Sequence, residues 1–219
     1  MTLQLFAHPF SSYCWKVMIA LHENATLFDL RRLGPDQPAN DAEWTRLWPL
    51  RRMPVLVDGR RTVIETDAIL EYLNRHYPGP VSLFPDQDDL AVEARMLASI
   101  ADDFVMRPMN VIVADALRPA EHRDRYGVDR ARERLSAIYA WLDDHLARRA
   151  WAVGDRFTHA DCAAAPALFY ADWAHPIDPA HATLTAYRAR LLARPCIARC
   201  VEDARPYRPF FPLGAPDRD

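Results

Sequence analysis

The chain has 219 residues, half of them hydrophobic, which is enough for a sizeable buried core in one or two domains. Its 27 basic and 30 acidic residues are spread along the sequence and give a formal net charge of −3, which provides no basic face for nucleic acid. No apolar run approaches the roughly 18 residues of a membrane span, and the first residues do not form a secretory signal. We therefore expect a cytoplasmic protein with neither a nucleic-acid nor a membrane partner.

The first elements to be expected are a strand, a helix and a second strand. Alternating Leu3 and Leu5 predict a short strand, and the segment from Cys14 to Leu21 has helical periodicity. The segment from Leu27 to Leu33 predicts the second strand. Because the connections are short, this order implies a right-handed parallel crossover.

A β-hairpin and a helix follow. A short helical piece runs through Trp44 and Leu47. The segments Val55 to Val57 and Thr62 to Ile64 flank an Asp-Gly turn, which is typical of a hairpin, and a helical pattern begins at Thr66. The complete order is therefore βαβ followed by ββα.

The composition changes after a proline-rich stretch that starts at Pro78. Alanine and arginine then dominate and helical periodicity takes over. We predict an α/β domain over residues 1–80, a linker over 81–89, and an all-α helical-bundle domain over 90–219. The expected helices are Leu90 to about Ala116 with a bend at Pro108, Asp129 to Arg149, Thr158 to Trp173, and Thr183 to Arg194.

Thr158-His159-Ala160-Asp161 predicts a capped helix start. A hydroxyl at the first position and a carboxylate three residues later can satisfy each other's free amides, an arrangement worth about 1 kcal/mol. We expect Thr158 and Asp161 to support folding rather than chemistry.

The four cysteines, Cys14, Cys162, Cys196 and Cys200, are too few for a disulfide framework in a chain of this length. Cys196 and Cys200 lie four residues apart, but no pair of histidines at ligand spacing accompanies them. We therefore expect free thiols and no metal site.

Ser11-Ser12-Tyr13-Cys14 lies between the first strand and the first helix, where free amides and the helix dipole favour an anion. The spacing of Ser11 and Cys14 is similar to that of a Cys-x-x-Cys redox pair in which serine has replaced the first cysteine. The serine hydroxyl could then donate a hydrogen bond to a sulfur brought by a ligand. In the alternative interpretation, Ser11 only caps the helix and Cys14 packs inward.

Two further segments could bind a peptide. In Met53-Pro54 a proline precedes a strand, and a cis bond there would turn the Met53 amide and carbonyl outward toward an extended ligand. Thr66 could cap the next helix, whose amides would receive a carboxylate, while Glu65 could accept a hydrogen bond from a ligand amine. The alternative for this second segment is an ordinary helix cap with acidic neighbours.

Taken together, these motifs resemble the cytosolic glutathione transferase family over nearly the whole chain. The resemblance implies a thioredoxin-like N-terminal domain, a helical C-terminal domain, a homodimer and a role in detoxification. It is carried by Ser11-Ser12-Tyr13-Cys14-Trp15-Lys16-Val17-Met18-Ile19-Ala20-Leu21, Met53-Pro54-Val55-Leu56, Glu65-Thr66, Ala68-Ile69-Leu70-Glu71-Tyr72-Leu73 and Phe157-Thr158-His159-Ala160-Asp161.

The resemblance implies that Ser11 faces the sulfur of glutathione, the co-substrate, with Ser12 as the competing catalytic candidate. Met53 would bind the cysteinyl backbone, and Glu65 and Thr66 the γ-glutamyl end. The residues assigned to glutathione binding in this way are Ser11, Arg52, Met53, Pro54, Glu65 and Thr66.

The second substrate would be an apolar electrophile bound between the domains. Phe104, Met109 and Ile112 are expected to form an apolar wall there, with packing in the core as the alternative for all three.

One departure from the family pattern and one further resemblance keep other functions open. The family often has Asn-Pro-x-Gly where this chain has Trp48-Pro49-Leu50-Arg51. This difference affects the shape of the loop that would contact the glycyl end of glutathione. A non-catalytic glutathione-binding or interaction module is therefore one alternative. The loop at Ser11 is also similar to that of the zeta class, which indicates glutathione-dependent cis–trans isomerisation as a second alternative, although that class usually has cysteine where Tyr13 stands.

Overall fold

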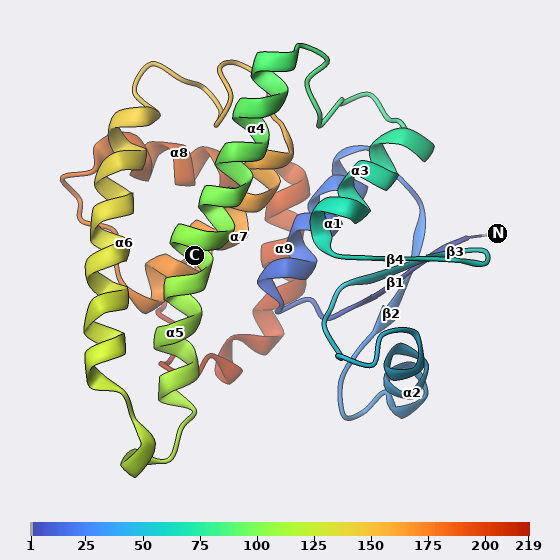
Figure 1. The fold of residues 1–219 in the computed structure, drawn as a ribbon, viewed down its shortest axis with the longest axis horizontal. Helices are drawn as coiled ribbons and strands as arrows, with labels where there is room; N and C mark the ends of the chain where they lie inside the picture. The colour runs from blue at the N-terminus through green and yellow to red at the C-terminus, as the bar shows by residue number, and fades with distance from the viewer. Residues whose placement is uncertain (1) are drawn as a thin grey trace.

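The computed structural model describes residues 2–219, and its N-terminal part is built on a four-stranded sheet with strand order β2-β1-β3-β4 (Figure 1). Strands β1 and β2 are parallel, whereas β3 pairs antiparallel with both β1 and β4. The predicted parallel connection is therefore present. The strands are β1 (Leu3–Ala7), β2 (Phe28–Arg32), β3 (Val55–Asp58) and β4 (Arg61–Ile64).

Helices cover both faces of the sheet because strand side chains alternate between the faces. Leu5 and Leu56 belong to the large core that includes residues of α1 (Ser12–Glu23) and α3 (Thr66–His76). The next residues along the strands, such as Phe6, point to the opposite face and form a smaller core with Trp44 of α2 (Pro38–Leu47). This is the thioredoxin-like α/β layer that the sequence predicts.

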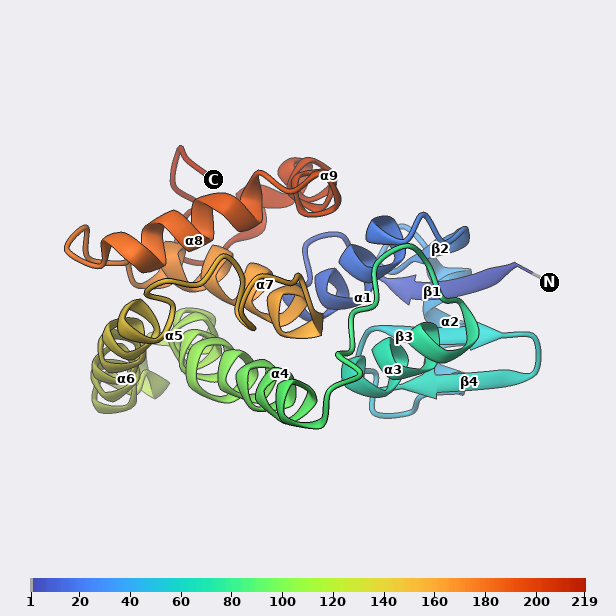
Figure 2. The same ribbon diagram turned by 90° about the horizontal axis from the view of Figure 1, so that it is seen from above.

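The rest of the chain is helical, and Figure 2 shows this part beside the sheet, with α1 next to α7. The fold is thus an α/β domain followed by an all-α domain. No helix within residues 2–219 has the length and apolar character that crossing a bilayer requires. The helical segments are α4 (Asp88–Ile100), a π-helical segment η1 (Ala101–Met106), α5 (Arg107–Ala116), η2 (Ala120–His122), α6 (Arg125–His145), α7 (His159–Ala174), α8 (Ala182–Leu192), α9 (Pro195–Ala204) and η3 (Arg205–Phe210).

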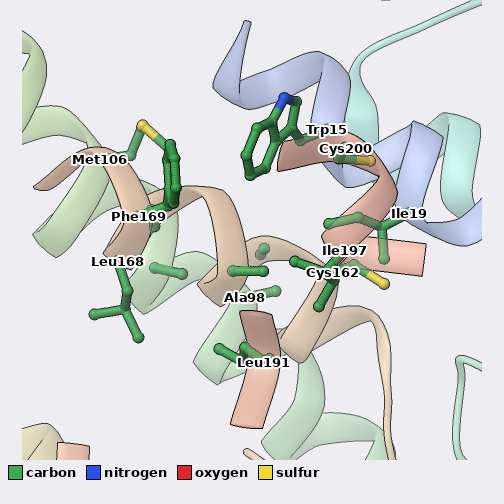
Figure 3. Packing of buried hydrophobic residues seen from close by; sticks show 14 of the residues in the cluster. Trp15, Ile19, Ala98, Met106, Cys162, Leu168, Phe169, Leu191, Ile197 and Cys200 are labelled. Carbon is green, nitrogen blue, oxygen red and sulfur yellow. The ribbon is translucent and has the colours of Figure 1, made fainter. Parts of the chain in front are cut away.

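Helix α1 joins the two parts through a shared core with α7 and α9. Trp15 is fully buried, its ring centroid lies 4.9 Å from that of Phe169, and its indole N–H donates to the Pro9 carbonyl at 2.6 Å. Figure 3 shows Ile19 near Ile197 in the same core. The position of the Ser11 loop therefore depends on packing against the helical part.

The predicted capping box at the start of α7 is confirmed. The Thr158 hydroxyl accepts a hydrogen bond from the Ala160 amide, and Asp161 accepts one from the Thr158 amide at 2.8 Å. Asp161 is completely buried and accepts further hydrogen bonds from the Ala152 amide and the Tyr187 hydroxyl. The pair thus ties the start of α7 to its surroundings.

The helix predicted from Leu90 to Ala116 has a different irregularity from the expected bend at Pro108. It begins at Asp88, inside the predicted linker, and widens into the π-helical segment η1 immediately before α5. Pro108 has no N–H and its ring crowds the preceding turn, so the chain adapts in the turn before the proline.

The following helices also differ in their limits. The predicted helix Asp129–Arg149 is shifted toward the N-terminus because Asp124 caps it, accepting from the Gly127 amide, and Arg148 adopts a left-handed φ of 69° beyond its end. The sequence analysis set no limits for α9, although Cys196, Ile197, Cys200 and Val201 recur at helical spacing along it.

Candidate functional site

Three segments leave the sheet at the same end. Phe6 near the end of β1 pairs with Val55 at the start of β3, and Val55 pairs with Ile64 at the end of β4. The β1–α1 loop, the Met53-Pro54 segment and the β4–α3 junction therefore emerge next to one another. The sheet thus brings together the three segments that the sequence analysis singled out separately.

The structure gives Ser11 and Ser12 different positions. Ser11 is the N-cap of α1, and its hydroxyl oxygen accepts from the Cys14 amide at 3.4 Å, whereas Ser12 is the first residue of the helix. Both are half-buried. A capping hydroxyl uses its oxygen as the acceptor and keeps its own proton for a second partner. Ser11 therefore combines a hydroxyl donor with the positive end of the helix dipole.

Cys14 does not supply a nucleophile to this site. Its side chain is fully buried, and burial raises the pKa of its thiol to about 11. The other cysteines are also buried: burial raises the pKa of Cys196 to about 12 and the pKa values of Cys162 and Cys200 well above the ordinary value. Any thiolate that reacts here near neutral pH has to come with a ligand.

The segment before β3 has the expected backbone form. The Met53–Pro54 peptide bond is cis. The Trp44 indole donates to the Arg52 carbonyl at 3.0 Å, and the guanidinium of Arg51 lies 5.3 Å from the centre of the Trp44 ring. The loop that departs from the family pattern is therefore anchored on α2, and Arg52 itself is exposed.

The β4–α3 junction differs from prediction by one position. Glu65, not Thr66, is the N-cap of α3, and its side chain makes no capping hydrogen bond. Its φ of 67° is strained for a residue with a side chain and costs of the order of 1–3 kcal/mol. Thr66 is the first residue of the helix and is largely buried. Such strain is concentrated at functional sites, and here it lies beside the free amides of a helix N-terminus.

The sequence analysis did not identify an ion cluster around the buried Lys16, which connects α1, α3 and η1. The Lys16 ammonium on α1 binds Asp67 of α3 at 3.0 Å and Asp102 of η1 at 2.6 Å. Burial opposes the charge on Lys16, but the two carboxylates outweigh it and raise the pKa of the lysine. The sequence signal was a single lysine that interrupts the otherwise apolar run from Cys14 to Leu21, all of which is buried.

Comparison with known proteins identifies the family. Residues 5–81 match the N-terminal domain of glutathione S-transferases, and residues 125–190 match their C-terminal domain. The chain belongs to the glutathione S-transferase family.

Several relatives and solved structures of this family are similar over most of the chain. A probable maleylacetoacetate isomerase of Vibrio cholerae is 28% identical over 94% of this chain and 98% of the relative. The glutathione S-transferase GstB of Escherichia coli is 29% identical over 70% of this chain and 76% of its own. The solved glutathione S-transferase of Methylobacterium radiotolerans, a complex with glutathione sulfonate, is 29% identical, with a TM-score of 0.79 over 92% of this chain and 95% of that one.

The residues predicted to line the electrophile site of this transferase fold do not share one environment. Phe104 is 55% exposed, whereas Met109 and Ile112 are buried in the core. The structure therefore gives Met109 and Ile112 the packing role that was the alternative, and it does not bring the three together as one exposed wall. They lie on different turns around the π-helical segment, whose register could not be derived from the sequence.

The C-terminal segment of the transferase fold packs on the β1–α1 loop. The ring centroid of Tyr207 in η3 lies 4.5 Å from that of His8. The same loop contacts α7, whose Tyr170 hydroxyl donates to the Phe10 carbonyl at 3.0 Å. The aromatic side chains of η3 thus lie close to the loop that carries Ser11.

Proposed function

We propose that the chain is a glutathione transferase that binds glutathione at the shared end of β1, β3 and β4 and activates its thiol beside Ser11. The observation that carries the proposal is the pairing of Phe6, Val55 and Ile64, which gathers a hydroxyl at a helix start, a backbone segment before a strand and a second helix start. Such a site suits a short peptide with a carboxylate at each end.

Each segment predicted to bind glutathione has a role in this proposal. The backbone of Met53, before Pro54, pairs with the cysteinyl residue, and the exposed guanidinium of Arg52 is available to the glycyl carboxylate. The amides of α3 at Thr66 receive the γ-glutamyl carboxylate, and Glu65 accepts from its amine.

The chemistry required of the protein is to hold a thiolate. The glutathione thiol has an ordinary pKa of about 8.5, and a hydrogen bond from Ser11 together with the α1 N-terminus lowers it toward neutrality. The thiol proton leaves to solvent. The sulfur then forms a bond to an electrophilic carbon, and the leaving group departs with its electron pair. Of the predicted electrophile contacts, Phe104 is kept because it is exposed.

Turnover of a reactive aryl halide by Ser11→Ala and Ser12→Ala variants tests this proposal. Removing a hydroxyl that stabilises developing or full negative charge costs roughly 10²-fold or more in kcat/KM. We expect that loss for Ser11→Ala and a small change for Ser12→Ala. Equal activity of wild type and Ser11→Ala would contradict the assignment, and a large loss only in Ser12→Ala would transfer the role to Ser12.

The similarity to the isomerase of Vibrio cholerae favours glutathione-dependent cis–trans isomerisation as a second candidate. In that reaction the thiolate adds to a carbon–carbon double bond and leaves again after rotation, so glutathione is regenerated. Tyr13 stands where the zeta class usually has cysteine. Conversion of a maleyl substrate at a rate that depends on glutathione would favour isomerisation, whereas retention on immobilised glutathione without either turnover would favour a non-catalytic binding module.

We further propose a cytoplasmic homodimer that acts in detoxification. Val92 and Met96 are apolar residues of α4 that are exposed by 62% and 45%. Their spacing keeps Val92 and Met96 on one side of the helix, and a second copy of the chain would cover them. Glutathione and a small electrophile are the proposed partners.

A further inference from the structure

Lys16 is the only lysine in the chain. Of the 27 basic residues, the other 26 are arginines. The side chain of Lys16 is completely buried. A chain that otherwise uses only arginine therefore places a single lysine in its interior, where an ammonium is costly unless its partners are well placed.

The partners of Lys16 belong to three different elements. The lysine is on α1, Asp67 is in the first turn of α3, and Asp102 is in the π-helical segment η1. Asp67 is 60% exposed, whereas Asp102 is 22% exposed and its second oxygen is buried without a hydrogen-bond partner within residues 2–219. The cluster thus connects the two helices that begin at Ser11 and at Thr66 to the helical domain.

The type of cation fits this geometry. An ammonium is compact and presents three donors around one point, so it can bind carboxylates that approach from separate elements. A guanidinium is planar and suits one carboxylate held in two parallel hydrogen bonds, as Arg194 holds Glu23. The stabilisation from a buried ion pair is small because desolvation opposes it, and geometric specificity is its better supported role.

Asp67 directly follows Thr66, so its position and that of the first amides of α3 are linked through one peptide unit. A movement of the first turn of α3 away from α1 would displace the Thr66 amide and lengthen the contact between Asp67 and Lys16. Ligand groups held by free amides require positioning to within about 0.5 Å.

We propose that Lys16 is a positioning residue for glutathione: by binding Asp67 and Asp102 it fixes the first turn of α3 relative to α1 and to the helical domain. This inference rests on the proposed function. It assigns to Lys16 the distance between the sites for the sulfur and for the γ-glutamyl carboxylate, and it leaves activation of the sulfur to Ser11.

The test uses a variant in which the two most buried charges are removed together. Lys16→Met alone would leave Asp102 buried without a cation. Lys16→Met/Asp102→Asn removes both, keeps the net charge of the cluster, and leaves only the exposed Asp67. The matched control is Asp103→Asn, because Asp103 is the next residue in the chain, is exposed, and pairs with Arg107 on the surface.

Calorimetric titration with reduced glutathione should give a Kd about tenfold or more higher for the double variant, and an unchanged Kd for Asp103→Asn. The pKa of the bound thiol should stay within about half a unit of wild type, because Ser11 and the start of α1 are unaltered. A folded double variant that binds glutathione like wild type would overturn the positioning role. So would a raised thiol pKa with unchanged affinity, which would make Lys16 an electrostatic activator of the sulfur.

A measurement on the wild-type protein keeps the inference testable if the double variant fails to fold. Because the chain has one lysine, isotope-labelled lysine gives a single side-chain ammonium signal by nuclear magnetic resonance. The signal should shift on addition of glutathione and saturate with the calorimetric Kd. A signal that does not move while glutathione binds would overturn the inference alone, whereas a wild-type protein that takes up no glutathione would overturn the proposed function itself.

Discussion

Ser11 and Cys14 differ in whether their side chains are accessible to a ligand. Ser11 is half-buried at a helix start and offers a hydroxyl proton, whereas Cys14, three residues later, is enclosed by the core. Their spacing is similar to that of a redox pair in which serine has replaced the first cysteine. Burial gives them different roles, because it raises the pKa of the Cys14 thiol to about 11 and keeps that thiol almost entirely protonated near neutral pH.

Replacing Cys14 with alanine should therefore leave catalysis intact. We expect kcat/KM within about twofold of wild type and a free energy of unfolding lower by about 1 kcal/mol, because a buried sulfur is lost without a charge. Steady-state kinetics and urea denaturation measure the two effects. Loss of activity in a variant that remains folded would mean that the protein's own thiol takes part.

Among the elements, α1 makes the contacts that matter most to the site. It is capped by Ser11, carries Lys16, packs against α7 and α9, and ends at Glu23. Glu23 is only 11% exposed and accepts from the Arg194 guanidinium at 2.9 Å, which ties the end of α1 to the start of α9. The orientation of the helix is thus fixed at both ends by polar contacts.

The Glu23–Arg194 pair should give the protein an acid-dependent part of its stability. Burial would raise the pKa of Glu23, but hydrogen bonds from Arg194 and Cys196 outweigh it and lower the pKa from an ordinary 4.5. A carboxyl with a lowered pKa stabilises the fold above its unfolded value, and this stability is lost as the pH falls through the folded value. Glu23→Gln should lower the free energy of unfolding by about 1–2 kcal/mol near pH 7, and by less near pH 3.

Urea denaturation of wild type and Glu23→Gln at the two pH values checks this expectation. Glu202→Gln is the matched control, because that residue forms a surface pair with Arg205 and is exposed. A constant difference between wild type and Glu23→Gln at both pH values would contradict the pH dependence.

The elements also show how far the sequence could predict this structure. The order of strands and helices around the sheet followed from apolar periodicity and turn residues, and the capping box from Thr158 and Asp161 alone. The π-helical segment could not be predicted, because Pro108 indicates an irregularity but not whether the chain bends at the proline or widens in the turn before it. Without the register of that segment, the sequence left both an apolar wall and core packing open for Met109 and Ile112, which the structure buries.

The candidate site was predictable where it consists of local motifs. Ser11, Met53 and Glu65 were each singled out from their neighbours in the chain, and the sheet register explains why they meet. The Lys16 cluster could not be derived, since Asp67 and Asp102 lie 51 and 86 residues away from the lysine in sequence. Long-range polar pairs leave no periodic signal.

At the scale of the whole molecule, the exposed apolar side chains of α4 lie in the interface of the proposed homodimer. Met96→Glu should shift the protein toward the monomer, because the charge would be buried without a partner. Leu117→Glu is the control, since Leu117 is exposed at the far end of α5. Sedimentation velocity over a concentration series measures the shift, and a wild-type protein that is monomeric throughout would contradict the proposal.

The central claim is that glutathione binds with its sulfur as a thiolate beside Ser11. An ultraviolet pH titration of the thiolate in the complex tests it most directly. The account predicts a bound-thiol pKa below the ordinary value of about 8.5, and a rise of about 1–2 units in Ser11→Ala. A bound thiol that titrates like free glutathione, or one whose pKa does not change when Ser11 is replaced, would contradict it.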